Sequence, residues 1–265
     1  MDKTIELVNS VKDIHAMPSV IVKALNIMKK PTASMKELGD IVMFDQSLTI
    51  KILALVNSAY YGFSQQISSF NIALSLLGMV KVKNIIVAVA MKPMMSNQGD
   101  KELWKHSMRV AAGCEYLANL TKIMDSDEAF ISGFVHDVGK MVLHMANEKL
   151  YTKVISAVAD GADILDAERK YFDSDHVKTG SLLAKRWQLP ILLANIISYH
   201  HNPSLSSIPV PCNLVCLVDK IVQDRFNPNA LDKDFIKNLG IDFADVEDLR
   251  ESILQKAELL ISELS

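Results

Sequence analysis

Cysteine is scarce in this sequence. The 265 residues include three cysteines, Cys114, Cys212 and Cys216, and no two of them have the CxxC spacing. An odd number of cysteines without a CxxC pair argues against a disulfide framework or a pair of thiol metal ligands. We therefore expect reduced, mostly buried thiols, as is usual in a cytoplasmic protein.

Basic runs and membrane-spanning runs are also missing. The chain has 28 Lys and Arg against 31 Asp and Glu, a net charge of -3, and no block of basic residues. Nucleic-acid binders usually carry a basic stripe, so nucleic acid is not an expected partner. The longest apolar runs, such as 84–91 (NIIVAVAM), are too short to span a bilayer. The first residues lack a signal-peptide core, so we expect a cytoplasmic protein without membrane contacts.

Strand-like alternation of apolar and polar residues is absent, whereas helical spacing occurs in almost every segment. Residues 19–29 carry a helical apolar stripe, and Ser34 and Glu37 form a capping box. Asp45 can cap a further helix, followed by helices over 69–78 and 80–91. No repeat of fixed period occurs, which argues against a solenoid. The sequence therefore predicts an all-α fold.

A polar, glycine-containing stretch at 94–100 (MMSNQGD) lies between two helical patterns. Such a stretch is typical of a domain boundary. It predicts two lobes, an N-terminal helical bundle over 1–95 and a second helical lobe over 96–265. In the second lobe we expect helices at about 102–122, 127–146, 148–160, 176–187, 190–201, 212–224 and 244–265.

The residues suited to metal chemistry all lie in the predicted second lobe. Imidazoles and carboxylates are the ligands expected for Fe, Mn or Zn sites that leave positions open for water and a phosphate ester. On one continuous helix over 127–146, adjacent His and Asp side chains would point about 100° apart and could reach the same ion. The candidates for one or two ions are His106, His136, Asp137, His176, His200, His201 and Asp219.

Each candidate also has a plain structural interpretation. A single histidine in an apolar helix is more often a satisfied core residue than a ligand, and Asp219 could lie on a helix surface. Asp175 is interpreted as a helix cap. Lys140 could extend to solvent, pair with Asp137 or contact a phosphate, and it is the one candidate catalytic residue. The adjacent His136 and Asp137 are more specific, because buried unpaired charge is costly.

Two remaining histidines, His15 and His144, have no partners in the sequence and are assigned no role.

The order of these residues resembles the HD superfamily of metal-dependent phosphohydrolases. That resemblance implies a metal site formed by His106, the doublet His136 and Asp137, and the distant Asp219. With the three later histidines, the set also resembles the dinuclear site of HD-GYP cyclic-di-GMP phosphodiesterases. The G-Y-P signature is missing, however, because residues 202–209 read NPSLSSIP.

Several further motifs are similar to those of the HDOD domain, the HD-related output domain. Together they cover roughly residues 10 to 225, and Val56 replaces an alanine of the family pattern. The matching segments are 16–25 (AMPSVIVKAL), 45–62 (DQSLTIKILALVNSAYYG), 67–78 (ISSFNIALSLLG), 104–107 (WKHS), 134–140 (FVHDVGK), 175–180 (DHVKTG), 187–190 (WQLP) and 200–203 (HHNP).

The HDOD resemblance implies an all-helical, bacterial signal-transduction module that is regulatory rather than catalytic. Its implied partners are signalling proteins acting in trans, such as receiver, GGDEF or kinase components. The family is regarded as having lost its metal ligands, whereas the HD-type positions of this chain are filled. A metal-dependent phosphohydrolase or phosphodiesterase acting on nucleotides or cyclic dinucleotides is therefore the alternative.

The segment 57–62 (NSAYYG) separates the HDOD resemblance from other HD proteins. Its plain interpretation is a helix end, with Gly62 as the cap and the tyrosines packed with their hydroxyls bonded. The alternative is a surface for a ligand or partner.

Overall fold

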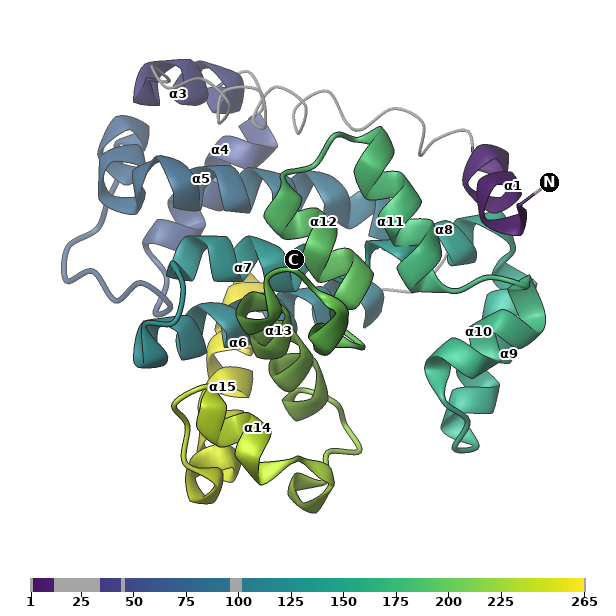
Figure 1. Cartoon of the computed structure of the whole chain (residues 1–265). Helices are drawn as coiled ribbons and strands as arrows, with labels where there is room; N and C mark the ends of the chain where they lie inside the picture. Colours follow the sequence, from purple (N-terminus) through teal and green to yellow (C-terminus); the bar gives the residue numbers. More distant parts are fainter. Residues whose placement is uncertain (1, 12–33, 44–45, 96–101, 265) are drawn as a thin grey trace.

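The computed structural model describes residues 2–11, 34–43, 46–95 and 102–264. Every regular element within these ranges is a helix (Figure 1), which confirms the predicted all-α class. The α-helices are α1 (Lys3–Ser10), α3 (Met35–Met43), α4 (Gln46–Val56), α5 (Phe70–Met95), α6 (Glu102–Thr121), α7 (Ser126–Val135), α8 (Val138–Ala146), α9 (Glu148–Ala159), α10 (Ile164–Phe172), α11 (His176–Arg186), α12 (Ile191–Tyr199), α13 (Pro209–Ile221), α14 (Lys233–Asn238) and α15 (Val246–Leu264). Short 3₁₀ turns occur at Pro203–Leu205, Pro228–Ala230 and Phe243–Asp245.

The first helices follow the predicted caps where they are described. The backbone N–H of Glu37 donates to Ser34 Oγ at 3.2 Å, and the Ser34 N–H donates back to Glu37 Oε2 at 3.1 Å. This confirms the capping box before α3. The helix expected over 19–29, the Asp45 cap, His15 and the centre of the expected boundary at 94–100 lie outside the described residues.

Helix α5 joins two segments that were expected as separate helices. Gly78 interrupts it with φ +78°, a left-handed value that glycine adopts without steric cost. By length and composition α5 could cross a membrane, with a mean hydropathy of 1.9 over its best window. The apolar run at 84–91 therefore underestimates the length of this apolar helix, which has 26 residues. However, 56% of that window is buried inside the protein, as in the core helix of a globular domain.

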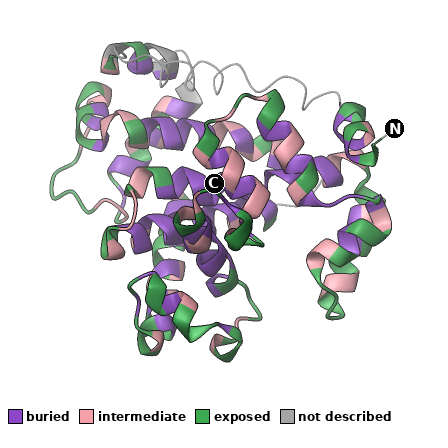
Figure 2. Ribbon diagram, viewed as in Figure 1, coloured by how far each residue is buried: buried purple, intermediate pink, exposed green. Residues whose placement is uncertain are grey.

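The main hydrophobic core crosses the predicted lobe boundary. It unites Ile52 and Ile86 with Trp104, Phe134 and Leu260, all of which are at most 2% exposed. Figure 2 shows this buried material concentrated along the central helices, with exposed residues on the outer turns. The division into two lobes therefore stays a prediction, and in the described residues the two halves share one core.

The prediction of one continuous helix over 127–146 is wrong, because this segment forms two helices. It is divided at the histidine–aspartate doublet, where α7 ends at Val135 and α8 begins at Val138. The two halves pack tightly on different neighbours. A Cβ at Gly133 would lie 2.7 Å from the Val110 carbonyl of α6, and one at Gly139 would lie 1.9 Å from the His176 carbonyl of α11. Because each half approaches a different backbone, the chain turns between them.

The remaining helices agree with the sequence analysis in part. Asp175 caps α11, its Oδ1 accepting from the Lys178 N–H at 2.9 Å, which confirms the predicted cap. Helix α13 begins at Pro209, three residues earlier than expected. Helices α10 and α14 were not predicted, and each begins with an aspartate cap, Asp163 and Asp232. Helices α9 and α10 extend together from the body of the molecule (Figure 1).

Candidate metal centre

Three residues from separate helices meet at the break between α7 and α8. His106 on α6 places Nε2 3.0 Å from Asp219 Oδ1 on α13. His136 Nε2, at the end of α7, lies 3.8 Å from the same oxygen. The ligand atoms of His106, His136 and Asp219 all lie within 4.8 Å of one another. Residues far apart in the sequence thus form one compact group of nitrogen and oxygen donors.

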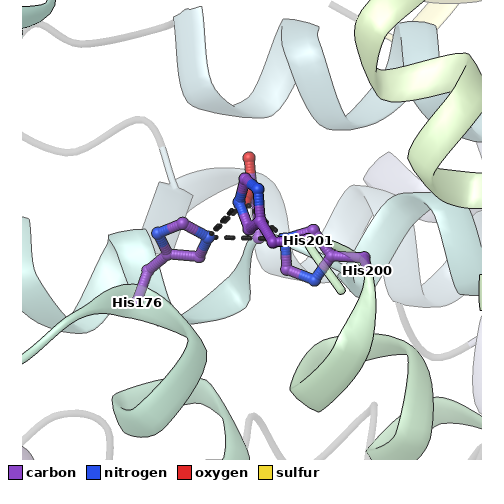
Figure 3. Close-up of side chains that lie close together, drawn as sticks. His176, His200 and His201 are labelled. Atoms are coloured by element: carbon purple, nitrogen blue, oxygen red, sulfur yellow. Dashed lines mark hydrogen bonds and ion pairs between the residues drawn. The ribbon is translucent and has the colours of Figure 1, made fainter. Parts of the chain in front are cut away.

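A second group of donors adjoins the first. His176 starts α11, while His200 and His201 follow α12, and Figure 3 shows their three rings facing one another. His176 Nε2 lies 3.3 Å from His200 Nε2 and 3.0 Å from His201 Nε2. With Asp137 these residues again have all their donor atoms within 4.8 Å of one another.

Asp137 connects the two groups through its two carboxylate oxygens. Its Oδ2 lies 3.2 Å from His136 Nε2 and 3.5 Å from His106 Nε2. Its Oδ1 lies 3.4 Å from His176 Nε2 and 3.6 Å from His200 Nε2. The helix break positions this carboxylate, since Asp137 has φ -98° and ψ 14° rather than helical values. The geometry is that of a carboxylate able to bridge two ions.

The buried imidazoles are held by their outer nitrogens. His136 Nδ1 lies 2.7 Å from the Gly133 carbonyl, and His200 Nδ1 lies 3.0 Å from the Ile196 carbonyl. Because a carbonyl oxygen only accepts hydrogen bonds, each Nδ1 must carry the proton. Nε2 is therefore the nitrogen that each ring directs toward the centre, as in metal-ligating histidines.

The pKa values differ between the two groups. Burial alone would lower the pKa of His136, but the charges and hydrogen bonds of Asp137 and Asp219 together outweigh burial and raise it to about 10. Burial would raise the pKa of Asp137, yet His136 and Lys140 hold it well below its usual range. In the second group, burial lowers the pKa of His176 far below the ordinary value and that of His201 to about 4. Two unprotonated imidazoles therefore face each other there.

Several donor atoms at the centre lack hydrogen-bond partners among the described residues. His106 Nε2, His136 Nε2 and Asp137 Oδ1 are buried in this state. Unsatisfied buried polar atoms are costly, and in the second group the facing Nε2 lone pairs of His176 and His201 repel each other. A divalent transition metal would pair with the unsatisfied donor atoms and remove the repulsion between the facing lone pairs. The imidazole–carboxylate donor set fits Fe, Mn or Zn.

Comparison with known proteins identifies the family of this chain. A model of the HDOD domain matches residues 14–203, well over half of the sequence. The chain belongs to the HDOD family. The matched HDOD range includes six of the seven candidate ligands but ends before Asp219, which packs against His106 nevertheless.

One curated relative of this HDOD chain is an uncharacterized protein of Treponema pallidum (strain Nichols). The two are 26% identical over 205 residues, which make up 74% of this chain and 39% of that protein. The chain thus spans well under half the length of the relative.

Solved structures resemble the HDOD chain over nearly its whole length. An HDOD domain protein of unknown function from Geobacter sulfurreducens has a TM-score of 0.84 at 22% identity, covering 98% of this chain and 97% of that one. A protein of Shewanella amazonensis SB2B, provisionally described as a phosphohydrolase, scores 0.77 at 21% identity with 98% coverage of both chains. A Marinobacter aquaeolei VT8 protein, provisionally described as a signal transduction protein, scores 0.77 at 19% identity, covering 94% and 58%. At these identities the likeness shows the fold.

Lys140 forms an ion pair with a candidate ligand. Its Nζ lies 2.5 Å from Asp137 Oδ2, and its side chain is mostly buried. Lys140 could extend to solvent, pair with Asp137 or contact a phosphate, and in the structure it pairs with Asp137. Its charge neutralises Asp137 on the side of the first donor group, so a cation binding there must compete with the lysine.

Glu168 is a site residue that the sequence analysis missed. Its Oε2 accepts from the His176 backbone N–H at 2.8 Å and lies 2.7 Å from His176 Nδ1. Burial raises the pKa of Glu168 to about 8. It lies on α10, the helix that was not predicted, so its sequence context gave no signal. The HDOD fold alone brings this carboxylate behind His176.

Proposed function

We propose that this HDOD chain is a regulatory signal-output module that binds divalent metal and does not turn over a substrate. The observation that carries the proposal is the set of seven converging donors, with Asp137 between the two groups. Most of the metal ligands would come from the buried residues His136, Asp137, His176 and His200. The remaining ligands would be His106, His201 and Asp219. Two ions, one in each donor group, would together cross-link α6, α7, α11, α12 and α13.

The enclosure of the cluster supports regulation over catalysis. Four of the seven residues, His136, Asp137, His176 and His200, are at most 1% exposed. A phosphoester must approach its metal directly, whereas the more open edge of this cluster consists of His106, with a side chain 24% exposed, and His201. Enclosed donor sets are typical of structural ions, and open positions are typical of catalytic ones.

We propose that the partners are other signalling proteins, such as receiver, GGDEF or kinase components. The support is family membership, together with a metal-stabilised helical scaffold that can present a constant surface. No membrane or nucleic-acid partner is part of this proposal.

The test is metal analysis of protein purified without chelator, with melting temperatures measured before and after adding Mn²⁺, Fe²⁺ or Zn²⁺. We expect bound transition metal and a higher melting temperature for the wild type. His136→Ala should lose both effects. His144→Ala is the matched control, because His144 stacks on Tyr151 with ring centroids 5.2 Å apart, away from the cluster. Absence of metal, with no thermal response to any of the three ions, would refute metal binding.

A metal-dependent phosphohydrolase or phosphodiesterase is the second candidate function. The observation in its favour is the pairing of two donor groups by one carboxylate, an arrangement common to two-metal phosphoester hydrolysis. Bound divalent ions would supply Lewis acidity toward the phosphoester. Lys140 would have to leave Asp137 in order to neutralise charge on the phosphate.

Turnover distinguishes the two candidates. Metal-loaded protein is assayed with phosphomonoesters, nucleotides and cyclic dinucleotides, alongside the His176→Ala and Lys140→Met variants. Hydrolysis that both substitutions reduce by two or more orders of magnitude would establish the enzyme. A metal-loaded protein that hydrolyses none of these compounds supports the regulatory module.

A further inference from the structure

A cavity of about 370 Å³ lies away from the candidate metal centre. Its wall comes from the loop after α4, from α5, from α6 and from α15. The lining residues are Tyr60, Tyr61, Lys81, Ala112, Glu115, Tyr116, Asn119, Leu120 and Lys256. None of them belongs to either donor group of the candidate metal centre. The volume lies within the range of small-molecule sites.

The inner wall of the cavity is a completed charge network. Glu115, 8% exposed, accepts from the Tyr60 hydroxyl at 2.5 Å and from Lys81 Nζ at 2.6 Å. Lys81 Nζ also lies 3.6 Å from Asp127 Oδ1, behind the wall. Both oxygens of Glu115 are therefore occupied, so the carboxylate is neutralised and offers no free charge to a cation.

The tyrosine pair supplies a fixed aromatic surface. Tyr61 packs edge-on against Tyr60 with ring centroids 5.0 Å apart, and Lys81 Nζ lies 5.8 Å from the Tyr61 centroid. These are the tyrosines of the 57–62 segment, for which the sequence left a structural and a ligand-binding interpretation open. The Tyr60 hydroxyl has the structural role, while Tyr61 still lines the cavity.

The outer wall carries polar groups that are available to a ligand. Lys256 on α15 places Nζ 5.1 Å from the Tyr116 ring centroid, and within the described part of the chain it forms no ion pair. Asn119 is exposed beside it. Of the two ammonium groups in the lining, Lys81 is already paired with Glu115 and Asp127, so Lys256 is the one that can meet an anion.

We propose that this cavity binds a small planar anion, an aromatic ring carrying a phosphate, of the size of a nucleoside monophosphate. The Lys256 ammonium would move from the Tyr116 face to the phosphate, which would also meet the Asn119 amide, and the ring would stack on the Tyr116 face that Lys256 leaves. A cationic ligand is disfavoured because lysines already lie on the faces of Tyr61 and Tyr116. A wholly apolar ligand would cover these polar groups without pairing them.

The experiment is isothermal titration of the full chain with four probes: AMP, GMP, adenosine and inorganic phosphate. Chelator is present throughout, so that phosphate cannot bind through metal. We expect at least one nucleotide to bind at least ten times more tightly than adenosine and phosphate. Lys256→Ala should weaken nucleotide binding about tenfold and leave adenosine binding unchanged. Tyr116→Leu should weaken nucleotide and adenosine binding alike.

Lys170→Ala is the matched control, because Lys170 Nζ lies 5.4 Å from the Tyr171 centroid on α10, a lysine–tyrosine contact remote from the cavity. It should bind the nucleotide as the wild type does. Three results would overturn the proposal: neither nucleotide binds at millimolar concentration, phosphate alone binds as tightly as the nucleotides, or Lys256→Ala leaves nucleotide binding unchanged. His176 does not line the cavity, so loss of nucleotide binding in a folded His176→Ala variant would also overturn the proposal and place the ligand at the candidate metal centre. None of these outcomes depends on whether the candidate metal centre binds an ion.

Discussion

His106 Nε2 lies 3.0 Å from Asp219 Oδ1, although the two residues belong to different helices and only His106 falls within the HDOD match. The contact completes the donor group around His136. It makes Asp219 a member of the candidate metal centre rather than a residue of a helix surface, and it separates the roles of the two aspartates. Asp219 serves one donor group, whereas Asp137 serves both.

This separation predicts different metal stoichiometries for two variants. Asp219→Asn should lose the ion of the His106 group and keep the ion of the His176 group, a change from two bound ions to one. Asp137→Asn should lose both, because its oxygens face each group. Bound metal per chain, measured by elemental analysis, checks this. Asp160→Asn, an exposed helix end, is the control. Equal metal content in Asp219→Asn and wild type would contradict the assignment.

Glu168 should tune metal affinity through His176. Glu168→Gln keeps the shape of the side chain but removes the negative charge that Glu168 gains above its raised pKa of about 8, beside His176 Nδ1. Loss of such an outer partner typically weakens metal binding about 10–100-fold. Competition with a coloured chelator measures the affinity. Asp166→Asn, on the same helix with a side chain 77% exposed, should behave as the wild type. An unchanged affinity in Glu168→Gln would contradict this outer role of Glu168.

Gly139 should be essential to the packing of α8 on α11. In Gly139→Ala the new Cβ would lie 1.9 Å from the His176 carbonyl, so the helices must separate. We expect the free energy of unfolding to fall by about 3 kcal/mol, at the upper end for overpacking. Urea denaturation measures this.

The matched control for Gly139 is Gly39→Ala in α3. There the new Cβ would lie 3.0 Å from Leu74 Cδ1, the end of a flexible side chain. The unfolding free energy should change by no more than about 1 kcal/mol, since alanine favours the helix. Equal losses in the two variants would mean that the close approach at Gly139 is not the cause.

The tyrosine–lysine network predicts lower stability in alkali. Burial, with the charge of Glu115, raises the pKa values of Tyr60 and Tyr61 above the ordinary 10.0. Burial would lower the pKa of Lys81, but the charges and hydrogen bonds of Glu115 and Asp127 together raise it above 10.5. When the folded-state pKa is the higher one, stability is present below the unfolded pKa and is lost above it. The free energy of unfolding should therefore decrease as the pH rises beyond about 10.

Urea denaturation between pH 8 and 11.5 measures that slope. The double variant Tyr60→Phe, Tyr61→Phe removes two of the ionisable groups, and its stability should depend less on pH over this range. The same slope in the double variant and the wild type would assign the alkaline loss to other groups.

The sequence by itself determined the all-α class, the caps at Ser34 and Asp175 and the list of candidate ligands. These features depend on local spacing: apolar residues at helical intervals, and side chains that bond to the nearest free backbone N–H groups. The HDOD membership was likewise readable, because its motifs are short and continuous.

The tertiary structure alone decided the rest. The break between His136 and Asp137 arises because Gly133 and Gly139 approach two different backbones, which no local pattern in the chain specifies. Glu168 reaches His176 only because α10 folds back beside the start of α11. The convergence of His106, Asp219 and Asp137, and the cavity between Tyr61 and Lys256, depend on contacts between helices distant in sequence. Such contacts are set by the packing of the whole core.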